Sequence, residues 1–258
     1  YRGYQVTAEE LMTDNAIDLN CLVVRASLLH EIGGFATTLR RWIDHDLVIR
    51  ISRRADLVHL PYIACRYTND DDPTRITNSE SRHWQFAVYN RHLVDWEKLE
   101  GALGERVPGR VSVVTPAFQD HQRTIRAVES VLETAGDADV EVILIDNGSR
   151  EAVCRVLSAR FAARARVRYV RLPRNYNFAT GCNVGVSLST GEFIYFLNND
   201  TLTRTNWRDE LVAALSEEGV RGVQPLLSLP DGTIQTAGAV FVEGGLMPVH
   251  FLPRHPRG

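Results

Sequence analysis

The chain has 258 residues, of which 44% are hydrophobic and 24% are charged, as is ordinary for a soluble globular protein of one large or two small domains. The formal net charge of −3 gives no reason to expect nucleic acid as a partner. No apolar run approaches the ~18 residues of a membrane span, and the 4 cysteines form no Cys-x-x-Cys pair, which disfavours zinc or a disulfide framework and fits a reduced cytoplasmic setting.

The first 96 residues are predicted to mix short strands with helices. The clearest signal is the spacing of Ile43, Leu47 and Ile51, which places one apolar residue on each turn of a helix. Gly33 and Gly34 end the helix before it. The predicted elements are strands at 19–24, 57–60 and 62–67, helices at 26–32, 43–51 and 77–96, and an acidic loop at 69–73.

Asp44 and Asp46 lie at the N-terminal end of the predicted helix 43–51. One interpretation is structural, because negative charge is favourable at a helix N-terminus. The other is functional, with a carboxylate base at the mouth of a site. The residues alone leave both interpretations open.

Residues 97–110 contain two glycines before Pro108 and Gly109 and are predicted to be a linker. After it, apolar runs alternate with helical patterns, which predicts βαβ units, a mostly parallel sheet and an α/β fold. Asp120 is expected to cap the first of these helices. The predicted strands are 111–114, 140–145, 167–172 and 193–197, the last buried on both faces, and the helices carry residues 125–132, 152–163 and 179–188.

Turn-forming or polar residues follow three of these strands, at Pro116, at Asp146 and at Asn198 to Asp200. Right-handed crossovers bring the carboxyl ends of parallel strands to one edge, where open α/β sheets bind ligands. Asp146 can accept hydrogen bonds from a base or a ribose, and Asp200 can hold a hard divalent cation against a diphosphate. The structural alternative for Asp200 is a turn cap. Neither a G-x-G-x-x-G loop nor a P-loop motif occurs in the sequence.

Residues 111–245 resemble the N-terminal half of a family 2 glycosyltransferase, an α/β fold of the GT-A type with a Rossmann-like, mostly parallel sheet and flanking helices. Each matching stretch alone is a weak signal, and their order and spacing carry the resemblance. The stretches are 111–118, 142–149, 175–185, 196–201 and 231–238.

The resemblance implies roles for particular residues. The metal motif of the family is D-x-D, which here reads Asn198-Asn199-Asp200 and implies Mg²⁺ or Mn²⁺ held by Asp200 and Asn198. The residues implied to bind the nucleotide-sugar are Pro116, Ala117, Phe118, Asp146, Asn147, Asn175, Asn177, Asn183 and Asn199. For Asn175, Asn177 and Asn183, turn formation and helix capping are equally good interpretations.

Residues 19–67 resemble the C-terminal half of the same family. Residues 43–47 are similar to its E-D-x-D-L motif, which implies that Asp44 is the catalytic base, with Asp46 beside it. The usual Glu of the motif is Ile43 here. An inverting transfer needs such a base to deprotonate the acceptor hydroxyl.

The two halves therefore occur in reversed order, as an acceptor and base half at 1–96, a linker at 97–110 and a nucleotide-sugar half at 111–258. Two compatible explanations are expected. The chain is cut from a tandem glycosyltransferase, and its two halves can still fold onto each other as one permuted unit. The predicted function is transfer of a sugar from a nucleotide-diphosphate donor to a glycan or lipid-linked acceptor in bacterial surface polysaccharide synthesis, in the cytoplasm, with peripheral membrane association left open. The alternatives are a non-catalytic nucleotide-sugar-binding fragment and, with less support, a nucleotidyltransferase.

Overall fold

The computed structural model describes residues 6–17, 19, 22–60, 80–81, 83–97, 105–241 and 248–256. The chain divides into two compact units. Unit 1 comprises residues 1–129 and 139–202, and unit 2 comprises residues 130–138 and 203–258. Within the described residues no helix is long and apolar enough to cross a membrane.

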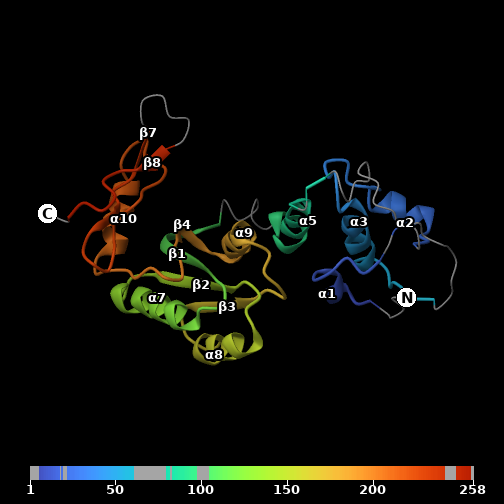
Figure 1. Cartoon of the computed structure of the whole chain (residues 1–258), viewed down its shortest axis with the longest axis horizontal. Helices are drawn as coiled ribbons and strands as arrows, with labels where there is room; N and C mark the ends of the chain where they lie inside the picture. Colours follow the sequence, from blue (N-terminus) through green and yellow to red (C-terminus); the bar gives the residue numbers. More distant parts are fainter. Residues whose placement is uncertain are drawn as a thin grey trace. The chain divides into compact units, whose positions relative to one another are not determined.

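The centre of unit 1 is a four-stranded parallel sheet in the order β3-β2-β1-β4. Helix α9 packs on β1 and β2, and Figure 1 shows α8 on the opposite face of the sheet. The α/β class with a mostly parallel sheet and flanking helices is thereby confirmed. The elements are β1 (Val107–Ala117), α7 (His121–Thr134), β2 (Val140–Asp146), α8 (Glu151–Phe161), β3 (Val167–Arg171), α9 (Phe178–Leu188) and β4 (Gly191–Phe196).

Strand β2 contains the apolar run Val142 to Ile145, in which three of the four residues are β-branched. Val142, Ile143 and Ile145 are fully buried, because the strand has a neighbour on each side and a helix layer over each face. Burying each such side chain contributes about 1.5–3 kcal/mol. Helix α9 approaches the sheet closely at Gly185, where a Cβ would lie 2.3 Å from Cγ1 of Val114.

Strand β4 differs from its prediction. The run 193–197 was expected to be buried on both faces, but β4 lies at the end of the strand order and Phe196 is 55% exposed. An edge strand has one neighbour, so its apolar residues are covered less completely. Strand β1 also begins earlier than expected, at Val107, inside the predicted linker. Its pairing with β4 shifts between Val107 and Val111.

The helices of the first part are α1 (Ala8–Leu11), α2 (Ala26–Glu31), α3 (Ile43–Ser52) and α5 (Trp84–Leu93). Helices α2 and α3 agree with the prediction. The predicted helix 77–96 is wrong in length, since the chain is extended at Val94, directly after α5. A core of Leu11, Val48, Ile49 and Val88 joins α1, α3 and α5.

Two predicted strands of this part are wrong where the chain is described. Residues 22–25 and 56–60 have no strand structure. Val23 is 97% exposed and Val58 is 75% exposed, so these apolar side chains have no layer to cover them. The predicted strand 62–67 and the predicted loop 69–73 lie outside the described residues.

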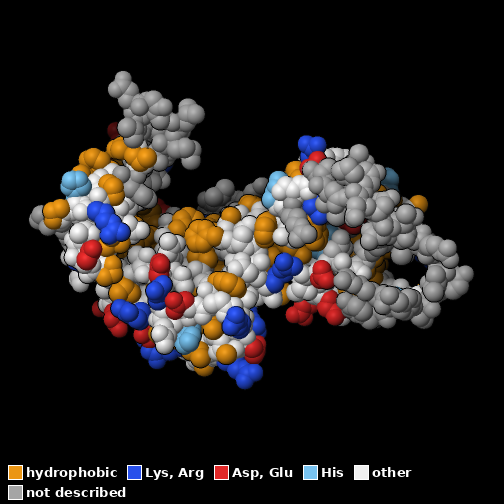
Figure 2. All heavy atoms as spheres, viewed as in Figure 1, with side chains coloured by type: hydrophobic (Ala, Val, Ile, Leu, Met, Phe, Trp, Pro, Cys, Tyr) orange, Lys and Arg blue, Asp and Glu red, His pale blue; other side chains and the backbone are white. Residues whose placement is uncertain are grey.

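Unit 2 contains α10 (Trp207–Leu215) and two antiparallel hairpin-like pairs. Strand β5 (Leu227–Ser228) pairs with β6 (Ile234–Thr236), and β7 (Ala239–Phe241) pairs with β8 (Pro248–His250). On the face seen in Figure 2, acidic and basic side chains are intermingled, as the small net charge suggests.

Candidate nucleotide-sugar site

The carboxyl ends of β1, β2 and β4 lie at one edge of the sheet, as predicted. Ala117 is opposite Asp146 in the register, and the backbone N–H of Asn147 donates to the Ala117 carbonyl at 2.9 Å. On the other side of β1, the N–H of Leu197 donates to the Val114 carbonyl at 3.0 Å. The three polar segments that follow these strands therefore leave the sheet side by side.

The metal candidates Asn198 and Asp200 both have exposed side chains, whereas Asn199 between them is half-buried. The Asn199 amide donates to the Thr124 hydroxyl on α7 at 3.0 Å. This contact turns Asn199 inward and leaves its two neighbours facing solvent. An amide oxygen and a carboxylate suit a hard cation such as Mg²⁺. The described residues contain no group of three His, Cys, Asp or Glu that could hold a metal. One carboxylate and one amide oxygen match the small protein ligand set of Mg²⁺, which usually keeps water and phosphate oxygens as its other ligands.

The residues after β1 differ in exposure. Pro116 and Ala117 are buried, and Phe118 is 46% exposed. Of these three side chains, only the Phe118 ring is therefore open to a ligand, and a flat aromatic ring suits stacking on a nucleobase.

Asp146 and Asn147 are buried, and their polar atoms are used inside the protein. Asp146 accepts from the Ser149 backbone N–H through Oδ1 and from the Tyr169 hydroxyl through Oδ2, both at 2.9 Å. Burial, together with the hydrogen bonds to Cys154 and Asp146, raises the pKa of Tyr169, so this hydroxyl stays a donor. The geometry shows that Asp146 shapes the turn after β2. Its contact with a nucleotide stays a prediction.

Asn147 clamps the loop before α9. Its amide Nδ2 donates to the Asn177 carbonyl at 2.7 Å, and its Oδ1 accepts from the Tyr176 N–H at 3.0 Å. Asn177 has a positive φ of 82° and caps α9 by accepting from the Thr180 N–H at 2.9 Å. Asn175 Oδ1 accepts from the Asn177 N–H at 2.9 Å. Turn and cap roles are thus present for Asn175 and Asn177, as the structural interpretation expects.

Asn183 lies on α9, and its amide donates to Asn90 Oδ1 on α5 at 2.8 Å. Tyr89 of α5 also contacts the loop before α9, where its ring lies 4.7 Å from that of the buried Tyr176. The Arg174 guanidinium lies over the rings of both tyrosines. Helices α5 and α9, which come from the two predicted halves, therefore contact each other within unit 1. That the halves form one permuted catalytic unit stays a prediction.

Asp44 and Asp46 lie in the first turn of α3, as predicted, but in different surroundings. Asp44 is half-buried, and its Oδ1 accepts from the His45 N–H at 2.8 Å. Asp46 is fully buried and bonds to Arg50 and His92. Of these two carboxylates, Asp44 is the one that is partly open to solvent, and its role as a base stays a prediction. Asp44 and Asp200 belong to the same compact unit.

The side chains around Asp44 include polar atoms with no hydrogen-bond partner among the described residues. His45 and Tyr89 are fully buried, yet both His45 ring nitrogens and the Tyr89 hydroxyl lack one. The His45 ring lies edge-on to Trp42 at 5.5 Å and to Tyr89 at 5.7 Å. Burial lowers the pKa of His45 to about 4, so the ring is neutral near pH 7. Sequence reasoning missed this group, because its members are separated along the chain.

Sequence reasoning also missed Gly148, where the turn after β2 meets the loop before α9. Gly148 has a φ of +76°, and a Cβ there would lie 2.1 Å from the carbonyl carbon of Arg174. Both the conformation and the space demand glycine. Its place between Asn147 and Ser149, directly after a strand, is a signal that could have been used.

We expect Gly148→Ala to destabilise the protein by about 3 kcal/mol or more, because a methyl group would displace the Arg174 backbone. The matched control is Gly33→Ala, since Gly33 has the same φ of +76° with nothing within 4 Å of its Cβ position. That control is expected to show only the conformational cost of about 1–2 kcal/mol. Urea unfolding measures the loss of unfolding free energy in both variants. Equal losses would contradict the close approach at Gly148.

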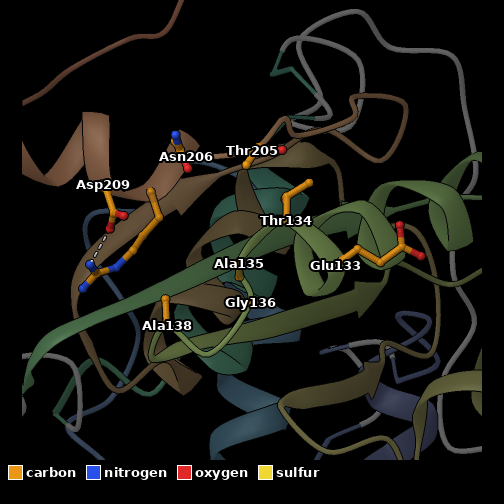
Figure 3. Close-up of a pocket in the computed structure, with 9 residues that line it drawn as sticks. Glu133, Thr134, Ala135, Gly136, Ala138, Thr205, Asn206 and Asp209 are labelled. Carbon is orange, nitrogen blue, oxygen red and sulfur yellow. Dashed lines mark hydrogen bonds and ion pairs between the residues drawn. The ribbon is translucent and has the colours of Figure 1, made fainter.

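Unit 2 contains a cavity of about 370 Å³ between the end of α7 and the start of α10, shown in Figure 3. Arg208 and Asp209, which both line the cavity, form an ion pair at 2.8 Å. None of the predicted site residues lines this cavity. Its lining residues are Glu133, Thr134, Ala135, Gly136, Ala138, Thr205, Asn206, Arg208 and Asp209.

Comparison with known proteins gives one family match. Residues 112–233, just under half of the chain, match the model described as glycosyl transferase family 2. The chain is 28% identical over 247 residues to the uncharacterized protein y4gI of Sinorhizobium fredii, covering 87% of this chain and 27% of the relative. It is 26% identical over 238 residues to the O-antigen biosynthesis protein RfbC of Myxococcus xanthus, covering 85% of this chain and 18% of the relative.

Among solved structures, S. aureus TarS in complex with UDP-GlcNAc is similar at 17% identity and a TM-score of 0.37, with 45% of this chain and 37% of that chain covered. The chain spans less than a third of the length of y4gI and RfbC, at 27% and 18%.

Proposed function

We propose that the chain carries the donor site and the base of an inverting glycosyltransferase, because residues 112–233 match the model of glycosyl transferase family 2. In the proposed reaction a sugar leaves a nucleotide-diphosphate donor and joins a hydroxyl of a glycan or lipid-linked acceptor. The similarity to an O-antigen biosynthesis protein supports bacterial surface polysaccharide as the product class. A cytoplasmic location, with or without contact to the membrane face, is part of the proposal.

The observation that carries the proposal is the carboxyl edge of the sheet. Asn198 and Asp200 face solvent, while Asn199 is tied inward to Thr124. These oxygens would hold Mg²⁺ or Mn²⁺, which when bound neutralises charge on the departing diphosphate. The exposed Phe118 ring after β1 offers a stacking surface for the base. Asn147 and Asn177 support the site indirectly, by fixing the loop that precedes α9.

Asp44 is the proposed base. Its carboxylate takes the proton of the acceptor hydroxyl, whose oxygen attacks the anomeric carbon as the bond from that carbon to the diphosphate breaks. The nucleoside diphosphate leaves on the opposite face, which inverts the configuration. The His45 N–H holds one Asp44 oxygen at 2.8 Å and leaves the carboxylate able to accept a proton.

Calorimetric titration with UDP, GDP and dTDP, each with Mn²⁺ and with EDTA, tests the donor site. We expect one of the nucleotides to bind in a Mn²⁺-dependent way. A transfer assay with the matching nucleotide-sugars and lipid-linked acceptors then tests turnover. Metal-dependent binding without transfer would favour the alternative of a non-catalytic binding fragment, and absence of nucleotide binding would overturn both.

A further inference from the structure

Asp46 connects three helices from a fully buried position. Its Oδ2 accepts from Arg50 Nε at 2.9 Å one turn along α3, and its Oδ1 accepts from His92 Nε2 at 2.9 Å on α5. Arg50 also donates through Nη1 to the Ile32 carbonyl at 2.7 Å, at the end of α2. Asp46 therefore ties α3 to α5 directly and to α2 through Arg50.

The charges of this cluster are balanced. Burial raises the pKa of Asp46, but hydrogen bonds from His92 and Arg50 outweigh burial and lower it, so the carboxylate is ionised at neutral pH. Burial also lowers the pKa of His92, so its ring is a neutral donor. The Arg50 side chain is 17% exposed and supplies the counter-charge. Arg91, at 3.8 Å, and the neighbouring His45 are the other titratable groups that face Asp46.

The first turn of α3 has little local support of its own. Trp42 at the N-cap has a positive φ of 64° and provides no side-chain cap. Asp44 bonds only weakly to Asn15, with Nδ2 to Oδ2 at 3.4 Å, and otherwise to the N–H of its own neighbour. The strong contacts of this turn are those of Asp46, two residues beyond Asp44. These Asp46 contacts can therefore hold the helix turn that carries Asp44 and so set the direction of the Asp44 side chain.

We propose that His92 and Arg50 are positioning residues, which act through the Asp46 carboxylate to hold the first turn of α3 and so aim Asp44. The role as base belongs to Asp44 alone, and Asp46 is a structural carboxylate. This inference rests on the proposed function of Asp44. Breaking a buried pair of this kind leaves an uncompensated charge, so removal of either partner disturbs the turn.

The test compares the wild type with His92→Leu and with His92→Gln, whose amide can still donate to Asp46. NMR follows the titration of the Asp46 carboxyl carbon and the exchange of the His45 amide hydrogen, which bonds to Asp44. In His92→Leu we expect the pKa of Asp46 to rise and the His45 amide to exchange about tenfold faster or more, through weaker local protection. In His92→Gln both are expected to return most of the way to wild type.

Two controls separate positioning from general stability. Val88→Ala removes a fully buried side chain from α5 without touching Asp46, and His83→Leu replaces an exposed histidine next to α5. Both are expected to leave the Asp46 titration and the His45 exchange unchanged. In an active preparation, His92→Leu is expected to lower kcat by about 100-fold with the donor KM unchanged, as a small misplacement of a base does.

The outcomes are distinct for the two hypotheses. Unchanged Asp46 titration and His45 exchange in His92→Leu would overturn this inference, whether or not the protein transfers sugar. Equal changes in Val88→Ala would also overturn it, since they would reflect loosened packing. Full transfer by Asp44→Asn would overturn the proposed role of the base and leave the His92 contact to Asp46 as a structural result.

Discussion

Asp44→Asn is expected to lower the rate of sugar transfer by about 10²–10⁴-fold and to leave donor binding unchanged. Asn has the shape of Asp and can still accept the His45 N–H, but it cannot take a proton from the acceptor hydroxyl. The loss should therefore appear in kcat and not in the donor dissociation constant. Initial rates at saturating donor and calorimetry with the same donor measure the two quantities.

The matched control for this variant is Asp56→Asn, an exposed aspartate just beyond the end of α3. It makes the same change in charge in the same segment and is expected to keep full activity. Equal losses of transfer rate in the two variants would mean that the rate depends on the overall charge of the segment and not on a base at residue 44. Weaker donor binding in Asp44→Asn would contradict a role confined to the acceptor proton.

Asp200→Ala is expected to lower Mn²⁺-dependent nucleotide binding by about 100-fold or more, because in the proposed site the cation would lose the carboxylate ligand at the edge of the sheet. Asn198→Asp is expected to strengthen Mn²⁺ binding, since it places a second carboxylate two residues away, and both side chains are exposed. Electron paramagnetic resonance counts the free Mn²⁺, and calorimetry measures the nucleotide.

Asp137→Ala is the control for the metal experiment, because Asp137 is an exposed aspartate outside the carboxyl edge. It should leave Mn²⁺ and nucleotide binding unchanged. If Asp200→Ala kept the metal dependence of nucleotide binding, the cation would not be held at the edge after β4. If Asn198→Asp had no effect, residue 198 would not be a ligand.

The elements that sequence predicts well are those with a strong local pattern. Two examples are the run Val140 to Ile145, which forms a strand, and the spacing of Ile43, Leu47 and Ile51, which forms a helix. In each case the apolar side chains are buried together in only one of these two conformations. Val23 and Val58 show the limit of this reasoning. A short apolar run becomes a strand only where a neighbouring strand supplies hydrogen bonds and a packed layer covers its side chains. The segments of Val23 and Val58 have no strand structure, and these two side chains are exposed.

The sequence predicts which residues lie at the carboxyl edge of the sheet. It does not predict which of their side chains are open to a ligand. The parallel topology brings Ala117, Asp146 and the segment at Asp200 to one edge, and this follows from the alternation of strands and helices. Which side chains stay open at that edge does not follow from it. Phe118 and Asp200 are exposed, whereas Asp146 is closed off by Tyr169, 23 residues further along the chain.

By itself, the sequence determined the α/β class, the common edge of the sheet and the carboxylates that could act there, because each depends on short-range pattern and on the handedness of the chain. Only the tertiary structure decided that Asp44 is accessible while Asp46 is a buried link, since His92 comes from a helix 46 residues away. The energy of a buried carboxylate depends on which donors surround it, and those donors are brought together by folding.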